Sequence, residues 1–121
     1  MIQDSHGAKE RWFYPDTFMP DTSDGVSHEA ICFLNPSDRD AHIAFTAYYE
    51  DKEPAGGFEA VCRARRTNHI RLDTLVNPEG VKLPVNTPYA LIAESDIPVF
   101  CEYTRVDASV PARAMITVTG L

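Results

Sequence analysis

A short polar segment near the middle of the chain is the best candidate for chemistry, because three side chains with different hydrogen-bonding groups are spaced two residues apart. Thr67, His69 and Arg71 would project from one face of a strand. A row made of a hydroxyl, an imidazole and a guanidinium could bind a sugar or an anion. It could equally be the solvated face of an edge strand, where charges block unwanted pairing. The residues leave both interpretations open.

Three further polar residues extend this candidate site. Arg66 falls on the opposite strand face unless a bulge or the adjoining turn rotates it. Arg105 and Asp107 follow an apolar strand, where a carboxylate could orient the guanidinium or simply form an internal ion pair with it. Thr67, His69 and Arg71 are the safer core of the hypothesis. We predict a shared ligand-binding site, within one protomer or where protomers meet, made of Arg66, Thr67, His69, Arg71, Arg105 and Asp107.

The sequence carries no recognisable catalytic motif. The cysteines Cys32, Cys62 and Cys101 lie in apolar segments without CxxC spacing, so we expect buried free thiols. No GxSxG elbow presents a nucleophile. The glycines 56–57 precede a strand, as in a hairpin turn, and lack the rest of a phosphate-binding loop. We therefore expect a protein that is not an enzyme.

Some β-sandwiches hold a metal with His and Glu side chains on adjacent strands. His28, His42 and His69 all lie within or next to expected strands. Such sites usually place two histidines one residue apart, so that both face inward, and this chain has no His-x-His pair. We therefore predict no metal site.

The charge balance bears on the possible partners. The chain has 121 residues, with 11 basic and 18 acidic side chains and a formal net charge of −7. A negative surface repels phosphate backbones, so the charge disfavours nucleic acid as a general partner. The local cluster Arg63, Arg65 and Arg66 is the only basic group dense enough to bind an anion.

The N-terminus and the hydropathy pattern bear on location. The first residues lack a basic start followed by an apolar core of signal length, so we expect no export signal. No apolar run approaches the roughly 18 residues needed to cross a bilayer. We expect a cytoplasmic protein that reaches a membrane only through a partner.

The elements that would position these residues are strands. From His28 onward, short apolar segments alternate with turns at intervals of about a dozen residues, which is typical of a sandwich or barrel. No stretch has a sustained helical period. We predict an all-β fold of about eight strands, with a turn at 95–98. The strands expected individually are 30–34, 42–49, 58–64, 67–72, 89–93, 99–105 and 114–119.

Residues 1–27 are rich in Asp, Pro, Ser and Gly and are expected to form an irregular arm. The cluster Trp12-Phe13-Tyr14 would pin this arm to the core or to a neighbouring subunit. The predicted organisation is a single domain over 1–121, with the arm at 1–27 and a β-sandwich at 28–121.

Five segments, in order and with similar spacing, resemble successive motifs of the sensory rhodopsin transducer family. They are residues 27–35, 38–42, 48–54, 64–71 and 103–107. The resemblance implies a β-sandwich with jelly-roll-like topology, assembled as a homotetramer, without a cofactor or catalytic activity. It implies a non-enzymatic module that transduces a signal from a membrane photoreceptor.

The resemblance leaves two other functions open. Similar proteins occur in bacteria without such a photoreceptor, which suggests a carbohydrate or small-metabolite sensor unrelated to light. A metal-dependent β-sandwich enzyme is the third and weakest alternative.

Overall fold

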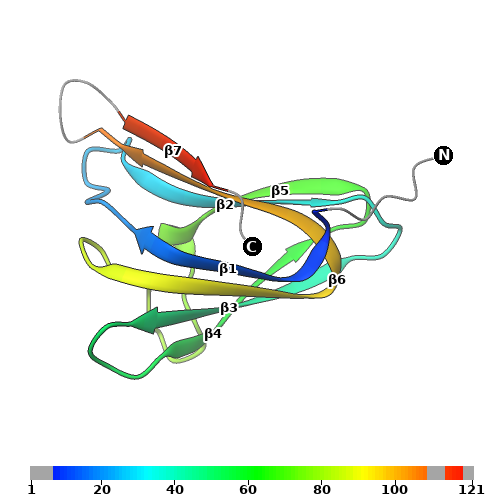
Figure 1. Cartoon of the computed structure of the whole chain (residues 1–121), viewed down its shortest axis with the longest axis horizontal. Coiled ribbons are helices and arrows are strands. Elements are labelled where there is room, and N and C mark those ends of the chain that lie inside the picture. The colour runs from blue at the N-terminus through cyan, green and yellow to red at the C-terminus, as the bar shows by residue number, and fades with distance from the viewer. Residues whose placement is uncertain (1–6, 109–113, 119–121) are drawn as a thin grey trace.

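The protein is built almost entirely of β-strands (Figure 1). The computed structural model describes residues 7–108 and the backbone of 114–118. Within this part there are seven strands and one short 3₁₀ helix, and the predicted all-β class is confirmed. The elements are β1 (Lys9–Phe18), β2 (His28–Asn35), β3 (Ala41–Tyr49), β4 (Ala55–Cys62), β5 (Arg66–Arg71), η1 (Leu72–Thr74), β6 (Pro88–Asp107) and β7 (Ala114–Val118).

The seven strands form one antiparallel sheet that is curled over on itself. The order along it is β4-β3-β6-β2-β5, and β1 and β7 also pair with β6. Figure 1 shows the two halves facing each other, with β1, β3 and β4 in one layer and β2, β5 and β7 in the other. β6 belongs to both layers. The buried side chains fill the space between them, which gives a sandwich-like fold made from a single sheet.

The turn predicted at 95–98 is wrong, because β6 runs through this segment as one strand. Ser95, Ile97 and Val99 are buried while Asp96 and Pro98 are exposed, so strand alternation is unbroken. Pairing with β3 ends at Ser95, and pairing with β2 begins just after Val99. Pro98 therefore lies where neither of these strands needs its missing N–H. Two expected strands, 89–93 and 99–105, are in fact one.

The predicted irregular arm is also wrong for residues 9–18, which form β1 against β6. Trp12 and Tyr14 are buried and Phe13 between them is exposed, as strand alternation requires. The register shifts between Tyr14 and Thr17, so Pro15 lies at a bulge, where proline is tolerated. The cluster thus anchors this segment to its own core through Trp12 and Tyr14 and leaves Phe13 outside.

A buried asparagine fixes the corner where the chain passes between the layers. The Nδ2 of Asn35 donates to the carbonyls of Arg39 (2.7 Å) and Cys62 (2.9 Å). Its Oδ1 accepts the backbone N–H of Ser37 at 3.1 Å, as in an Asx-type turn. These bonds tie the β2–β3 connection to the end of β4.

Candidate functional site

Two residues of the predicted site lie in an open groove on the outer face of the β5-β2-β6 layer. The groove has a volume of about 340 Å³, and Thr67 and His69 line it. Strand register places His69 opposite Cys32, which is in turn opposite Glu102 on β6. A second row places Thr67 beside Leu34 and Phe100. Two rows of side chains, each crossing three adjacent strands, thus form the base of the groove.

The groove lining combines apolar and polar groups. Leu34 is 47% exposed and, with the ring of Phe100, offers an apolar surface. The Thr67 hydroxyl donates to the carbonyl of Phe33 at 3.0 Å, and its oxygen can still accept a hydrogen bond. Burial, together with the charge of Glu102, raises the pKa of the Cys32 thiol, so the thiol stays protonated near neutral pH. The lining suits a small molecule with both apolar and polar surfaces.

The groove also reaches the only tryptophan of the chain, Trp12. Its ring is 2% exposed. Among the buried side-chain polar atoms of the described residues, the indole Nε1 of Trp12 is the one without a hydrogen-bond partner. The fluorescence of this residue should therefore report on its immediate surroundings, including the groove.

Arg66 and Arg71 are placed outside the groove lining. Arg71 makes a bidentate pair with Asp73, with Nε–Oδ1 and Nη2–Oδ2 distances of 3.0 Å each. Arg66 is exposed, and its Nη1 donates to the carbonyl of Arg65 at 3.0 Å. Of the three-residue core of the hypothesis, the groove brings together Thr67 and His69 only.

Arg105 faces the other side of the sheet, toward the space between the layers. Its Nε donates to the hydroxyl of Tyr103 at 3.3 Å, and its Nη2 lies 3.8 Å from Asp16 Oδ1. The guanidinium carbon also lies 6.0 Å from the ring centre of Phe18. Asp107 is the last residue of β6 and pairs in register with β7. The six predicted residues therefore do not line one pocket.

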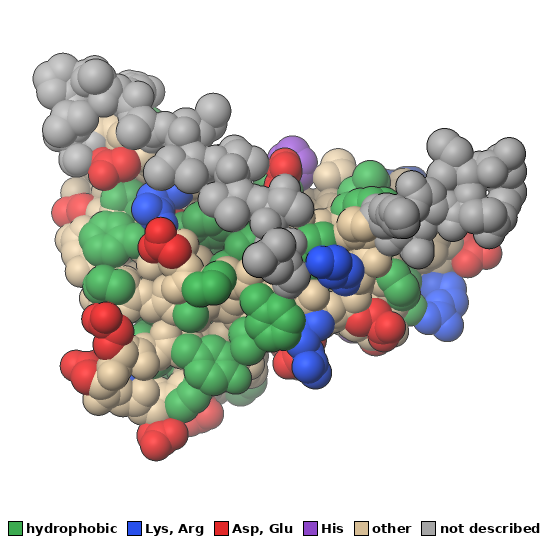
Figure 2. Space-filling view, viewed as in Figure 1, with side chains coloured by type: hydrophobic (Ala, Val, Ile, Leu, Met, Phe, Trp, Pro, Cys, Tyr) green, Lys and Arg blue, Asp and Glu red, His purple; other side chains and the backbone are tan. Residues whose placement is uncertain are grey.

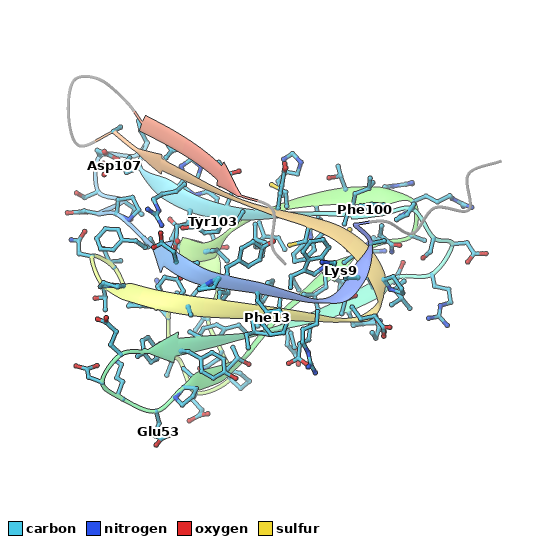
Figure 3. All side chains as sticks on the ribbon, in the orientation of Figure 1. Lys9, Phe13, Glu53, Phe100, Tyr103 and Asp107 are labelled. Carbon is cyan, nitrogen blue, oxygen red and sulfur yellow. The ribbon has the colours of Figure 1, made fainter. Side chains whose placement is uncertain are left out.

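A buried carboxylate that the sequence reasoning missed lies between the layers beside Arg105. Glu29 is completely buried. Its carboxylate accepts hydrogen bonds from the hydroxyl of Tyr89 at 2.5 Å, from the backbone N–H of Phe18 at 3.0 Å and from the hydroxyl of Tyr103. Figure 3 shows Tyr103 on β6, and the side chain of Tyr103 reaches this cluster. The cluster joins β1, β2 and both ends of β6.

Burial dominates the electrostatics of this cluster. It raises the pKa of Glu29, although the hydrogen bonds from Tyr103, Tyr89 and Phe18 and the nearby charge of Arg105 partly oppose the rise. Burial and the carboxylate also raise the pKa values of Tyr89 and Tyr103. Both phenols therefore stay protonated and keep donating to Glu29.

A signal for this cluster was present in the sequence. Glu29 has the same strand phase as Ile31 and Phe33, both of which are buried. An acidic residue on the core-facing positions of an apolar strand indicates a buried carboxylate that needs partners. The aromatic hydroxyls that supply them come from distant parts of the chain and could not be paired with Glu29 in advance.

The remaining candidates for chemistry were the cysteines and metal ligands. Cys62 and Cys101 are buried free thiols, as predicted, whereas Cys32 is only half-buried. In residues 7–108, no group of three His, Cys, Asp or Glu side chains is placed to hold a metal ion. No helix in the described part of the chain is long and apolar enough to span a membrane.

Fold and site together define a small all-β module with an open groove on one layer and a hydrogen-bonded acidic cluster between its layers. The chain belongs to the Anabaena sensory rhodopsin transducer family, whose signature it matches over residues 7–121. No curated protein sequence matched it.

Two solved structures are similar to this chain over most of its length. One is Thermotoga maritima 1070, at 32% identity and a TM-score of 0.81, which covers 93% of this chain and 92% of that one. The other is the Anabaena sensory rhodopsin transducer, at 34% identity and a TM-score of 0.72, which covers 84% of this chain and 90% of that one. The resemblance inferred from the five motifs is thereby confirmed.

Proposed function

We propose that this chain is a non-enzymatic, cytoplasmic module that transduces a signal or binds a small molecule in the outer groove. Membership of a transducer family supports the signalling role. The observation that carries the binding role is the groove itself, which has Thr67 and His69 on its wall. A volume of about 340 Å³ lies at the lower end of the range usual for small-molecule sites.

The partner in this proposal is a membrane photoreceptor, because one similar structure is named as a sensory rhodopsin transducer. The second candidate function is a carbohydrate or small-metabolite sensor unrelated to light. The mixed apolar and polar lining of the groove favours this second candidate. A rhodopsin gene beside the gene for this chain would favour the photoreceptor, and genes for sugar transport or hydrolysis would favour the sensor.

A thermal-shift screen with monosaccharides and small metabolites tests binding. A ligand present at 100 times its dissociation constant should stabilise the fold by about 2.7 kcal/mol. The His69→Ala variant should lose this shift. Arg71→Ala is a matched control on the same face of β5, and it should keep the shift because Arg71 lies outside the lining and pairs with Asp73.

Two outcomes would count against this site. If a compound stabilises the parent, His69→Ala and the control equally, it binds elsewhere. If no sugar or metabolite shifts the melting temperature or the fluorescence of Trp12, the sensor function is rejected, and the photoreceptor partner remains to be tested by co-purification.

The proposal includes self-association, as a homotetramer. A domain of this size buries only about two-thirds of the surface of its unfolded chain, so burial against copies of itself adds appreciable stability. Sedimentation velocity at micromolar concentration measures the assembly state, and a monomer under all conditions would remove this part of the proposal.

A further inference from the structure

Two connections meet at one end of the molecule and carry exposed arginines. They join β2 to β3 and β4 to β5, and the backbone N–H of Arg65 in one donates to the carbonyl of Ser37 in the other at 3.0 Å. Figure 2 shows basic side chains at the end of the molecule where Figure 1 places these connections, with acidic ones beside them. The exposed arginines here, which we call the arginine corner, are Arg39, Arg63, Arg65 and Arg66.

The arginine corner differs from the other described arginines in its ion pairs. The other three arginines within residues 7–108, which are Arg11, Arg71 and Arg105, are each paired with a carboxylate at 3.0 to 3.8 Å. No ion pair in this part of the chain involves the corner. The carboxylate of Asp40, in the same connection as Arg39, accepts the backbone N–H of Ala64 at 2.9 Å instead. The guanidiniums of the corner are thus available to an external anion.

The charge of the corner is opposite to that of the whole chain. Residues 36–40 and 63–66 carry four arginines and two aspartates, a net charge of +2, whereas the chain carries −7. All of the basic side chains are arginines, and a guanidinium can pair with a carboxylate through two parallel hydrogen bonds. The corner is therefore a local surface that attracts carboxylates on a protein that otherwise repels them.

The fold holds the backbone of the corner in place. Asn35 donates to the carbonyls of Arg39 and Cys62, which fixes both connections from the core side. Arg65 has a φ of +54°, in the left-handed region where Gly and Asn are the usual residues. Strained positions of this kind gather at functional sites. A fixed backbone also lowers the cost of ordering the side chains when a partner binds.

We propose that the arginine corner docks an acidic segment of a partner protein, in which aspartates or glutamates follow one another in an extended chain. The size of the corner favours such a segment over a long polyanion. A nucleic acid duplex would extend beyond the two connections onto a surface that is acidic overall, where its phosphates are repelled. A short acidic segment can end where the arginines end.

This surface is separate from the ligand site of the proposed function, because no arginine of the corner lines the outer groove. The inference therefore does not depend on a ligand in that groove. It concerns how a partner is held, whereas the groove concerns which small molecule is bound.

Fluorescence anisotropy of a dye-labelled oligo-glutamate peptide, titrated with the full chain at low salt, tests the proposal. The parent should bind the peptide with an affinity that falls as salt is added, and it should not bind a matched glycine-serine peptide. The Arg63→Ser/Arg65→Asn variant should bind roughly tenfold more weakly, because it removes two of the cations. Asparagine tolerates the left-handed backbone at position 65, so the turn is kept.

The matched control is Lys52→Ser/Lys82→Ser, which removes the same charge from two exposed lysines outside the corner. It should bind the peptide as the parent does. A gain of binding provides a check that misfolding cannot imitate. Asp38→Asn removes an exposed negative charge beside the arginines, and it should tighten binding about two- to threefold.

Four outcomes would overturn the proposal. The parent could fail to bind oligo-glutamate at low salt, or the corner and lysine variants could lose binding equally, which would make the attraction a general one. A DNA duplex could bind more tightly than oligo-glutamate and be lost in the same corner variant, which would assign the corner to nucleic acid. A loss of peptide binding in His69→Ala would place the peptide in the outer groove, whereas a failure of the groove to bind any small molecule leaves the corner unaffected.

Discussion

Strands β2 and β6 carry polar residues on both faces, and these are buried on the inner face but accessible to solvent on the outer face. On the inner face, Glu29 and Tyr103 are completely buried and hydrogen-bonded to each other. The alternate positions of these strands face outward, and there Cys32 and Glu102 line an open groove with His69. The same two strands thus supply a closed network on one side and an accessible site on the other.

This difference indicates what each set of residues does. A buried polar group must find partners within the fold, so the cluster around Glu29 mainly concerns stability. The groove residues are reachable from solvent, so they can exchange water for a ligand with little effect on the fold. Truncating residues of the cluster should therefore lower stability, whereas truncating residues of the groove should affect binding.

The largest effect is expected for Glu29→Ala. The change leaves two tyrosine hydroxyls without their acceptor between the layers and leaves the N–H of Phe18 with the longer bond to the Tyr103 hydroxyl, at 3.4 Å. Chemical denaturation should show a loss of about 3 kcal/mol or more, because each unsatisfied buried group costs about 1–3 kcal/mol. A loss below about 1 kcal/mol would mean that water or a rearrangement replaces the carboxylate, and the contrast between the two faces would fail.

The pH dependence of stability should follow from the raised pKa of Glu29. The folded state favours the protonated acid, so the contribution of Glu29 is fully present below its unfolded pKa and is lost as the pH rises through its folded pKa. Denaturation of the parent and of Glu29→Gln should be compared between about pH 4 and pH 8. The stability of the parent relative to the variant should fall as pH increases. A relative stability that rises instead would mean that the hydrogen bonds outweigh burial.

A smaller effect is expected for Tyr103→Phe, which keeps the ring but removes one donor to Glu29 and the acceptor used by Arg105. The loss should be about 1–2 kcal/mol, because hydrogen bonds to charged groups contribute about 1.5–3 kcal/mol and the carboxylate keeps its other two donors. Thermal unfolding monitored by circular dichroism measures it. An unchanged melting temperature would show that Tyr103 does not hold the carboxylate.

The smallest effect on stability is expected for His69→Ala. The side chain is exposed on an edge strand, so the free energy of unfolding should change by less than about 0.5 kcal/mol. The same denaturation assay applies, with Thr67→Ala as a comparison, because the Thr67 hydroxyl donates to Phe33 and its removal should cost more. A loss of 1 kcal/mol or more for His69→Ala would assign His69 to the fold and remove it from the binding site.

The sequence pattern predicted the class of fold well because short apolar segments with period-two alternation depend on local residues only. The segments around Ile31, Phe45 and Ile70 were all assigned correctly as strands. The pattern failed at Pro98 and Pro15, because proline usually interrupts strands. Here Pro98 falls between two pairing partners of β6 and Pro15 falls at a bulge, and both exceptions depend on strands distant in sequence.

The candidate site was only partly predictable for a related reason. Alternation correctly placed Thr67 and His69 on one outward face of β5. It could not show that Arg71 pairs with Asp73, or that Arg105 lies beside Tyr103 and Glu29. Those contacts arise from the turn after β5 and from the curl of the sheet, which short-range patterns do not describe.

The position of β6 in the chain also has a consequence for how the protein is made. This strand pairs with β1, β2, β3 and β7, yet five strands precede it in the sequence. A nascent chain can form the β3–β4 and β2–β5 pairs early, but it lacks the strand that joins them until residue 107 has left the ribosome. At about 5–20 residues per second, the 36 residues between the ends of β5 and β6 (107 minus 71) take roughly 2 to 7 seconds to synthesise. During that interval the apolar faces of the early strands stay uncovered, so folding during synthesis must wait for the late strand.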